Sequence, residues 1–85
     1  MKLIHFTADW CNPCKKIKPI IEQFIAENPD IEHKVIDVDK NMPAAMEYSI
    51  KSIPTLIFES DEKVVGRHSG AITYEQLYDL YTSSI

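Results

Sequence analysis

The chain has 85 residues, 45% hydrophobic and 26% charged, which is enough for one buried core and leaves no room for a second. Its formal net charge of −4 argues against nucleic acid as a partner, because phosphate binding rests on clustered Lys and Arg. No apolar run approaches the roughly 18 residues that span a bilayer, and the apolar N-terminal run is shorter than a secretory signal. We therefore expect one cytoplasmic domain, residues 1–85, with no membrane partner.

The first half of the chain predicts a strand followed by a helix. Residues 2–7 form a short apolar run, as in a buried strand. Between Asn12 and Glu27 the apolar residues recur at the spacing of a helix that packs by one face: Ile17, Ile20, Ile21, Phe24 and Ile25. Pro19 lies inside this helix, where it removes one backbone hydrogen bond and is expected to kink the axis.

The second half predicts three strands and two helices. Residues 32–39 read as a strand, and a short helical turn over 43–48 follows with Asn41 as its N-cap. Residues 55–58 and 63–68 form a hairpin. The last helix begins at Thr73, with Gln76 completing a capping box. Its apolar face comprises Tyr74, Leu77, Tyr78 and Tyr81.

This order of elements, βαβ(α)ββα, predicts an α/β fold. The first two strands flank a helix, so we expect them to be parallel and joined by a right-handed crossover. The hairpin adds an antiparallel edge. The result is a four-stranded mixed sheet with helices on both faces.

The only two cysteines, Cys11 and Cys14, lie between the first strand and the first helix. Two thiols at this spacing can form a small disulfide ring, and the second can displace whatever the first attacks. At a helix start, unpaired N–H groups and the positive end of the dipole favour the thiolate. The arrangement predicts dithiol redox chemistry.

Two other uses of the cysteines are less well supported. A structural disulfide across so short a loop constrains the unfolded chain little. Structural zinc needs four ligands, of which this motif supplies two, and the histidines show no ligand spacing relative to it: His5, His33 and His68. We therefore expect no metal.

Several segments together resemble the thioredoxin family. Residues 6–15, which include Trp10-Cys11-Asn12-Pro13-Cys14-Lys15, look like that family's active-site run. Residues 38–41 and 48–56 match at the family's spacing, and Pro19 and Gly70 lie where the family has a helix-kinking proline and a glycine before the last helix. The resemblance covers essentially the whole chain. It implies a minimal thioredoxin fold, without the strand and helix that precede the active-site strand in typical thioredoxins.

The chain departs from the family pattern at three places. Asn12 stands where the family usually has glycine, and His5 stands where it has a buried acid on the active-site strand. The glycine of the last hairpin is lost, with Asp61 and Glu62 nearby. The first two departures bear on the redox potential and on proton handling. They leave the redox activity itself in place.

The resemblance also implies a role for each site residue. Cys11 would be the more exposed thiol and the nucleophile, and Cys14 the resolving thiol. The Ile53–Pro54 bond would be cis and packed against the disulfide, with the Ile53 backbone pairing with an extended substrate. The docking surface would comprise Trp10, Asn12, Pro13, Ser52, Ile53, Ser69 and Gly70.

His5 has two readings on the sequence alone. It would lie beneath Cys14 as a proton relay, because histidine titrates near neutrality. Equally, it is a buried histidine whose ring is satisfied by a backbone group.

The leading prediction is a thioredoxin-like protein disulfide reductase, a monomer that serves electron transport and cell redox homeostasis. It would bind no cofactor beyond the redox-active disulfide Cys11–Cys14. The resemblance implies disulfide-containing protein substrates and electrons from an NADPH-dependent thioredoxin reductase, which Trp-Cys-X-Pro-Cys-Lys and Ile-Pro-Thr favour over glutathione. Three alternatives remain: a glutaredoxin-like glutathione-dependent reductase, a thioredoxin-fold binding module without turnover, and a disulfide oxidase.

Overall fold

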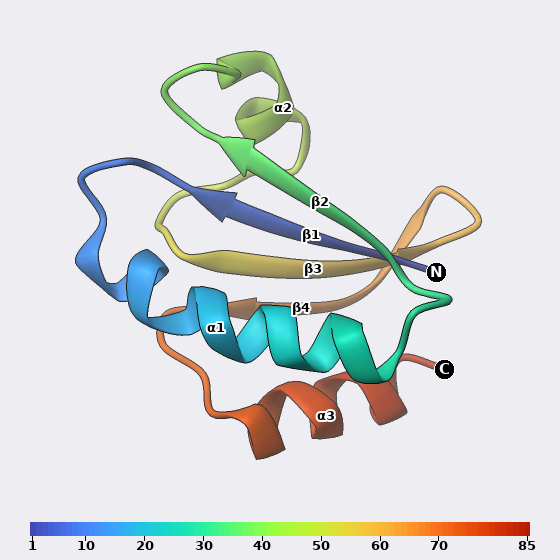
Figure 1. Ribbon diagram of the computed structural model, residues 1–85. Helices are drawn as coiled ribbons and strands as arrows, with labels where there is room; N and C mark the ends of the chain where they lie inside the picture. The colour runs from blue at the N-terminus through green and yellow to red at the C-terminus, as the bar shows by residue number, and fades with distance from the viewer.

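Four strands form one mixed sheet with helices on both faces (Figure 1). The computed structural model describes residues 1–85. Its elements are β1 (Lys2–Thr7), α1 (Asn12–Glu27), β2 (Glu32–Asp37), α2 (Met42–Glu47), β3 (Thr55–Ser60), β4 (Lys63–Ser69) and α3 (Tyr74–Ser83). The strand order is β2-β1-β3-β4, with β1 parallel to β2 and antiparallel to β3, and β3 antiparallel to β4. The predicted fold is confirmed.

The larger part of the core lies between the sheet and the pair α1 and α3, which cover the same face (Figure 1). Phe24 of α1 meets Phe58 of β3 edge to face, with ring centroids 6.0 Å apart. Nine buried residues form this cluster: Leu3, Ile17, Ile21, Phe24, Ile31, Leu56, Phe58, Ile72 and Leu77. Burying each large apolar side chain contributes about 1.5–3 kcal/mol, so this layer supplies most of the stability.

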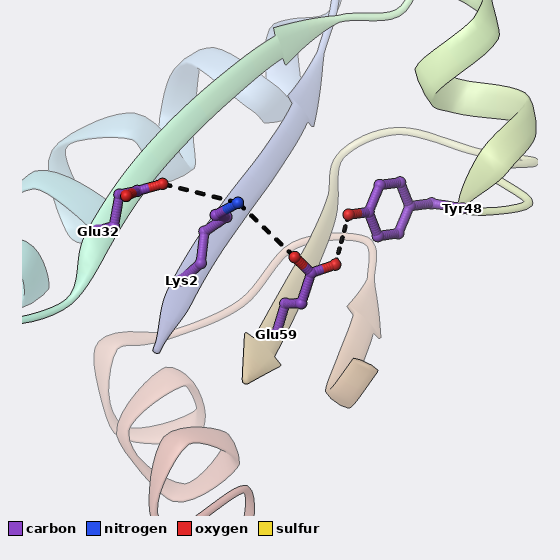
Figure 2. A network of polar contacts seen from close by, with 4 residues as sticks. All are labelled: Lys2, Glu32, Tyr48 and Glu59. Atoms are coloured by element: carbon purple, nitrogen blue, oxygen red, sulfur yellow. Dashed lines mark hydrogen bonds and ion pairs between the residues drawn. The ribbon is translucent and has the colours of Figure 1, made fainter. Parts of the chain in front are cut away.

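The opposite face carries a smaller apolar cluster and a polar network. Ile4, Phe6 and Ile57 are buried there, and side chains from α2 and its flanks pack on them. Figure 2 shows the network at the far end of this face. Lys2 Nζ lies 3.7 Å from carboxylate oxygens of both Glu32 and Glu59.

Tyr48, which follows α2, joins this network by donating a hydrogen bond to Glu59 (Figure 2). That hydrogen bond is the main reason that the pKa of Tyr48 is raised to about 12. Because Lys2 belongs to β1, Glu32 to β2 and Glu59 to β3, the network ties the end of α2 to three strands.

Two predicted elements differ from those observed. The second strand ends at Asp37 instead of residue 39, because Asp37 Oδ1 accepts the Asp39 N–H at 2.9 Å and turns the chain toward α2. On α3, Tyr78 is 47% exposed, and Leu80 packs against the core instead. The predicted caps Asn41 and Thr73 are both confirmed, and α1 continues through Pro19. None of the helices combines the length and the apolar character needed to cross a bilayer.

The turn between β3 and β4 uses two residues in the left-handed region. Asp61 has a φ of 53° and Glu62 a φ of 65°. Positive φ at both central positions is the pattern of a type I′ turn, which favours Asn-Gly or Asp-Gly. Without glycine, each side chain crowds the following carbonyl, at a cost of about 1–2 kcal/mol per residue.

Glu62→Gly is therefore expected to stabilise the protein by about 1 kcal/mol, because glycine adopts positive φ without that crowding. Urea denaturation should show a higher midpoint with an unchanged slope. Lys63→Gly, one residue further into the strand, is the matched control and should lower the midpoint. A Glu62→Gly midpoint at or below that of the wild type would contradict the prediction.

Candidate active site

The turn from β1 into α1 brings the two cysteines together. The Cys11 N–H donates to the Ala8 carbonyl at 3.1 Å, which closes the turn, and Cys11 is the N-cap of α1. Pro13 lies in the first helical turn, where the missing N–H removes no helical hydrogen bond. Cys14 follows one turn into the helix, and the two residues form a disulfide with Cα atoms 5.3 Å apart.

The two sulfurs have different surroundings. The Cys14 N–H donates to Cys11 Sγ at 3.2 Å, so this sulfur satisfies one of the unpaired donors at the helix N-terminus. A thiolate at that position gains from the hydrogen bond and from the helix dipole. Cys14 Sγ accepts no hydrogen bond from the helix backbone. The arrangement therefore favours the thiolate at Cys11.

Exposure does not separate the cysteines. Cys11 is 3% exposed and Cys14 1%, so the order is the expected one, but both residues are buried in the disulfide form. The reason is packing, because both cysteines cluster with Ala8 while Val38 and Ile53 lie over them. What distinguishes the two cysteines is the place of Cys11 at the helix start, where its sulfur accepts the Cys14 N–H.

The segment before β3 faces this disulfide. The predicted cis bond between Ile53 and Pro54 is confirmed, and Ile53 packs against the cysteines. The Pro54 carbonyl accepts the Gly70 N–H at 2.8 Å. The backbone N–H and C=O of Ile53 make no hydrogen bond within the chain, which leaves both free for another strand.

Ser52 and Ser69 of the predicted docking surface both contact Thr55. The Ser52 carbonyl accepts the Thr55 hydroxyl at 2.7 Å, and Thr55 Oγ1 lies 3.1 Å from Ser69 Oγ. These contacts hold the segment against β4. Gly70 has a φ of 97° and open space where a side chain would stand. No side chain at this position therefore projects above the surface beside Pro54.

An apolar groove of about 310 Å³ opens beside the disulfide. Trp10 forms one wall: its ring is 67% exposed, and its Nε1 donates to Asp39 Oδ2 at 2.8 Å, which fixes the ring while leaving its face free. Trp10 is thus no core residue. The groove is lined by Trp10, Val38, Ala45, Ile50, Lys51, Ser52 and Ile53.

The groove includes only part of the predicted docking surface. Asn12 and Pro13 are exposed at the start of α1, outside the groove. Sequence reasoning missed Val38, Ala45, Ile50 and Lys51, which belong to segments that meet only in the folded chain. Their only local signal is their position beside the matched segments 38–41 and 48–56.

His5 lies on the face of β1 that packs against α1, in a second groove of about 720 Å³ that Cys14 also lines. It is 3% exposed, and its Nε2 has no hydrogen-bond partner in the chain, so the reading of a ring satisfied at that atom by the backbone is not supported. Burial, with smaller effects of His33 and Lys18, lowers the pKa of His5 to about 4. The expected titration near neutrality is therefore wrong, and the imidazole is uncharged at pH 7.

The structure brings three or more His, Cys, Asp or Glu side chains together at no point where they could hold a metal ion.

The comparisons with known proteins agree with this geometry. A family model described as Thioredoxin matches residues 1–83. The chain is 42% identical over 81 residues to the thioredoxin of Buchnera aphidicola subsp. Baizongia pistaciae, covering 91% of this chain and 72% of that protein. It is 41% identical over 78 residues to the thioredoxin of Chlamydia trachomatis, covering 92% and 76%. The X-ray structure of Fasciola hepatica thioredoxin superposes with a TM-score of 0.88 at 36% identity, covering 96% of this chain and 79% of that one.

The burial of His5 makes stability depend on pH. Because its pKa falls from 6.5 in the unfolded chain to about 4 in the folded one, the two states bind protons equally above pH 6.5. As the pH falls toward 4, the unfolded state takes up a proton that the native state refuses, so the free energy of unfolding decreases. We expect His5→Leu to remove on the order of 2 kcal/mol of this decrease, measured by urea denaturation at several pH values. Parallel profiles for wild type and variant would contradict it.

Proposed function

Because the chain belongs to the thioredoxin family and is a thiol-disulfide oxidoreductase that reduces protein disulfides, we propose that Cys11 is the nucleophile and Cys14 the resolving thiol. The observation that carries this assignment is the Cys14 N–H that donates to Cys11 Sγ at the N-terminus of α1. The Cys11 thiolate attacks one sulfur of a substrate disulfide. A Cys11–substrate bond forms, the substrate S–S bond breaks, and the other substrate sulfur leaves as a thiolate.

The second step restores the disulfide seen in the structure. Cys14 loses its proton and attacks Cys11 Sγ, the mixed disulfide breaks, and the substrate leaves with its second sulfur reduced. Two electrons have then moved from the dithiol to the substrate. The place of Cys14, one turn into α1 and joined to the N-cap Cys11, supports this order because its sulfur is in position to attack Cys11 Sγ.

The substrate would lie across Ile53 and the Trp10 groove. The free N–H and C=O of Ile53 can pair with an extended segment, and the groove beside them can receive an apolar side chain next to the substrate cysteine. Asn12 and Pro13 would border the segment on the α1 side. Ser52, Ser69 and Gly70 would border it on the β4 side, with Pro54 below.

The general partners are disulfide-containing proteins and a thioredoxin reductase. We further infer that the reductase draws on NADPH, with glutathione as the alternative donor, and that the cycle runs in the cytoplasm, where the dithiol is kept reduced. Residues 1–85 would act as one monomeric domain. No cofactor besides the Cys11–Cys14 disulfide takes part in the cycle as proposed.

The two cysteine variants separate the two steps. Cys11→Ser should abolish insulin reduction, because no thiolate remains to attack. Cys14→Ser should also lose turnover, yet accumulate a covalent complex with a disulfide substrate that non-reducing gel electrophoresis detects. A stable covalent complex with Cys11→Ser and none with Cys14→Ser would reverse the assignment of the two cysteines. If the wild type bound partners without turnover, the protein would be a binding module.

The groove predicts a separate effect at Trp10. Trp10→Ala should raise KM for insulin about tenfold, because aromatic anchors carry much of the energy of such contacts. The same variant should react normally with a small aromatic disulfide that does not reach the groove. Trp10→Phe is the matched control: it keeps an aromatic ring but loses the hydrogen bond to Asp39, and its KM should lie between those of the wild type and Trp10→Ala. Equal KM values for all three proteins would exclude the groove as a docking site.

A further inference from the structure

Two histidines on neighbouring strands line the groove that Cys14 also lines. In the parallel pairing of β1 and β2, His5 lies opposite Val35 and His33 lies opposite Leu3, so the two histidines are diagonal neighbours on one face. Strand spacing and rise place such Cα atoms about 8 Å apart, within reach of two imidazole rings and one bridging water. The groove of about 720 Å³ admits several waters, each of which takes about 30 Å³.

In both imidazole rings the Nε2 atom lacks a hydrogen-bond partner within the chain. Nε2 of His5 and Nε2 of His33 are both buried and have no hydrogen-bond partner. Buried polar atoms are normally paired, so two unpaired imidazole nitrogens on neighbouring strands call for an explanation beyond the stability of the fold. A neutral imidazole with a free Nε2 accepts a proton.

The charges around the groove differ between the two rings. Five charged side chains line the groove from α1, β2 and the turn after β1: Asp9, Lys15, Lys18, Glu22 and Asp37. At His5, burial and the nearby His33 and Lys18 all lower the pKa. At His33, burial lowers the pKa but Glu22 acts in the opposite direction. A proton that reaches His5 is therefore drawn toward the half-buried His33.

We propose that His33 takes up the proton that His5 accepts from the Cys14 thiol and releases it to solvent during the resolving step. The inference rests on the proposed function, in which Cys14 displaces the substrate from Cys11. The S–H bond of Cys14 breaks as His5 Nε2 binds the proton, and the thiolate forms the new S–S bond with Cys11. The proton then passes through water to His33, and the departing substrate thiolate is neutralised from solvent. His33 touches no reacting sulfur and is a positioning residue that acts through His5.

The test follows both steps in one reaction. Reduced protein is mixed with dithiobis(nitrobenzoate) in a stopped-flow instrument, where Cys11 releases the first thionitrobenzoate and Cys14 the second. We expect His33→Asn to leave the first phase unchanged and to slow the second about tenfold near pH 6. The deficit should disappear toward about pH 9, where the thiol ionises without a base. Lys34→Gln, on the opposite side of the same strand, should match the wild type in both phases.

The order of the two histidines gives a further check. If the proton passes through them in series, His5→Asn combined with His33→Asn is no slower than His5→Asn alone. A second phase that equals the wild type at every pH overturns the proposal, as does a deficit that is the same at every pH or that adds to that of His5→Asn. If the assignment of Cys11 and Cys14 itself is wrong, Cys11→Ser releases its single equivalent in the fast first phase and Cys14→Ser does not, which is a different result.

Discussion

The structure depends on the burial of β1 between its two neighbours. The strand pairs with β2 on one side and β3 on the other, and residues on both of its faces are buried, Leu3 toward α1 and Ile4 toward α2. A strand held on four sides has one register, because a slip of one residue would exchange the two apolar layers. Its end is therefore fixed in space, and the turn that follows delivers Cys11 to the N-cap of α1. The redox-active cysteines therefore follow the end of a strand that is held by both neighbouring strands and by both apolar layers.

At that position one backbone group serves both folding and chemistry. The Cys14 N–H caps α1 through Cys11 Sγ, in the way that a serine or aspartate oxygen caps other helices. Because the acceptor is a sulfur, the cap improves as the sulfur becomes anionic. The facing segment is held to β4 by the Pro54 carbonyl, which accepts the Gly70 N–H, and this hydrogen bond does not involve the cysteines.

Local features were predictable from the sequence because they depend on residues a few positions apart. The caps Asn41 and Thr73, the span of α1 and the role of the cysteine pair are of this kind. Features that depend on long-range contacts were not. The register that places His33 beside His5 is decided by packing across about 30 residues of chain, and the low pKa of His5 follows from burial that spacing does not measure. The Trp10 groove was predicted only in part because its lining residues come from segments that meet only through long-range contacts.

The sulfur cap has a thermodynamic consequence. Folding and disulfide reduction form a closed cycle, so any free energy that the native chain adds to the Cys11 thiolate favours the dithiol over the disulfide by the same amount, relative to the unfolded chain. For a two-electron couple, about 30 mV corresponds to about 1.4 kcal/mol. The reduction potential of this protein therefore depends on how strongly the N-terminus of α1 stabilises the Cys11 thiolate. The difference between the unfolding free energies of the oxidised and reduced forms would report the same quantity with no redox partner present.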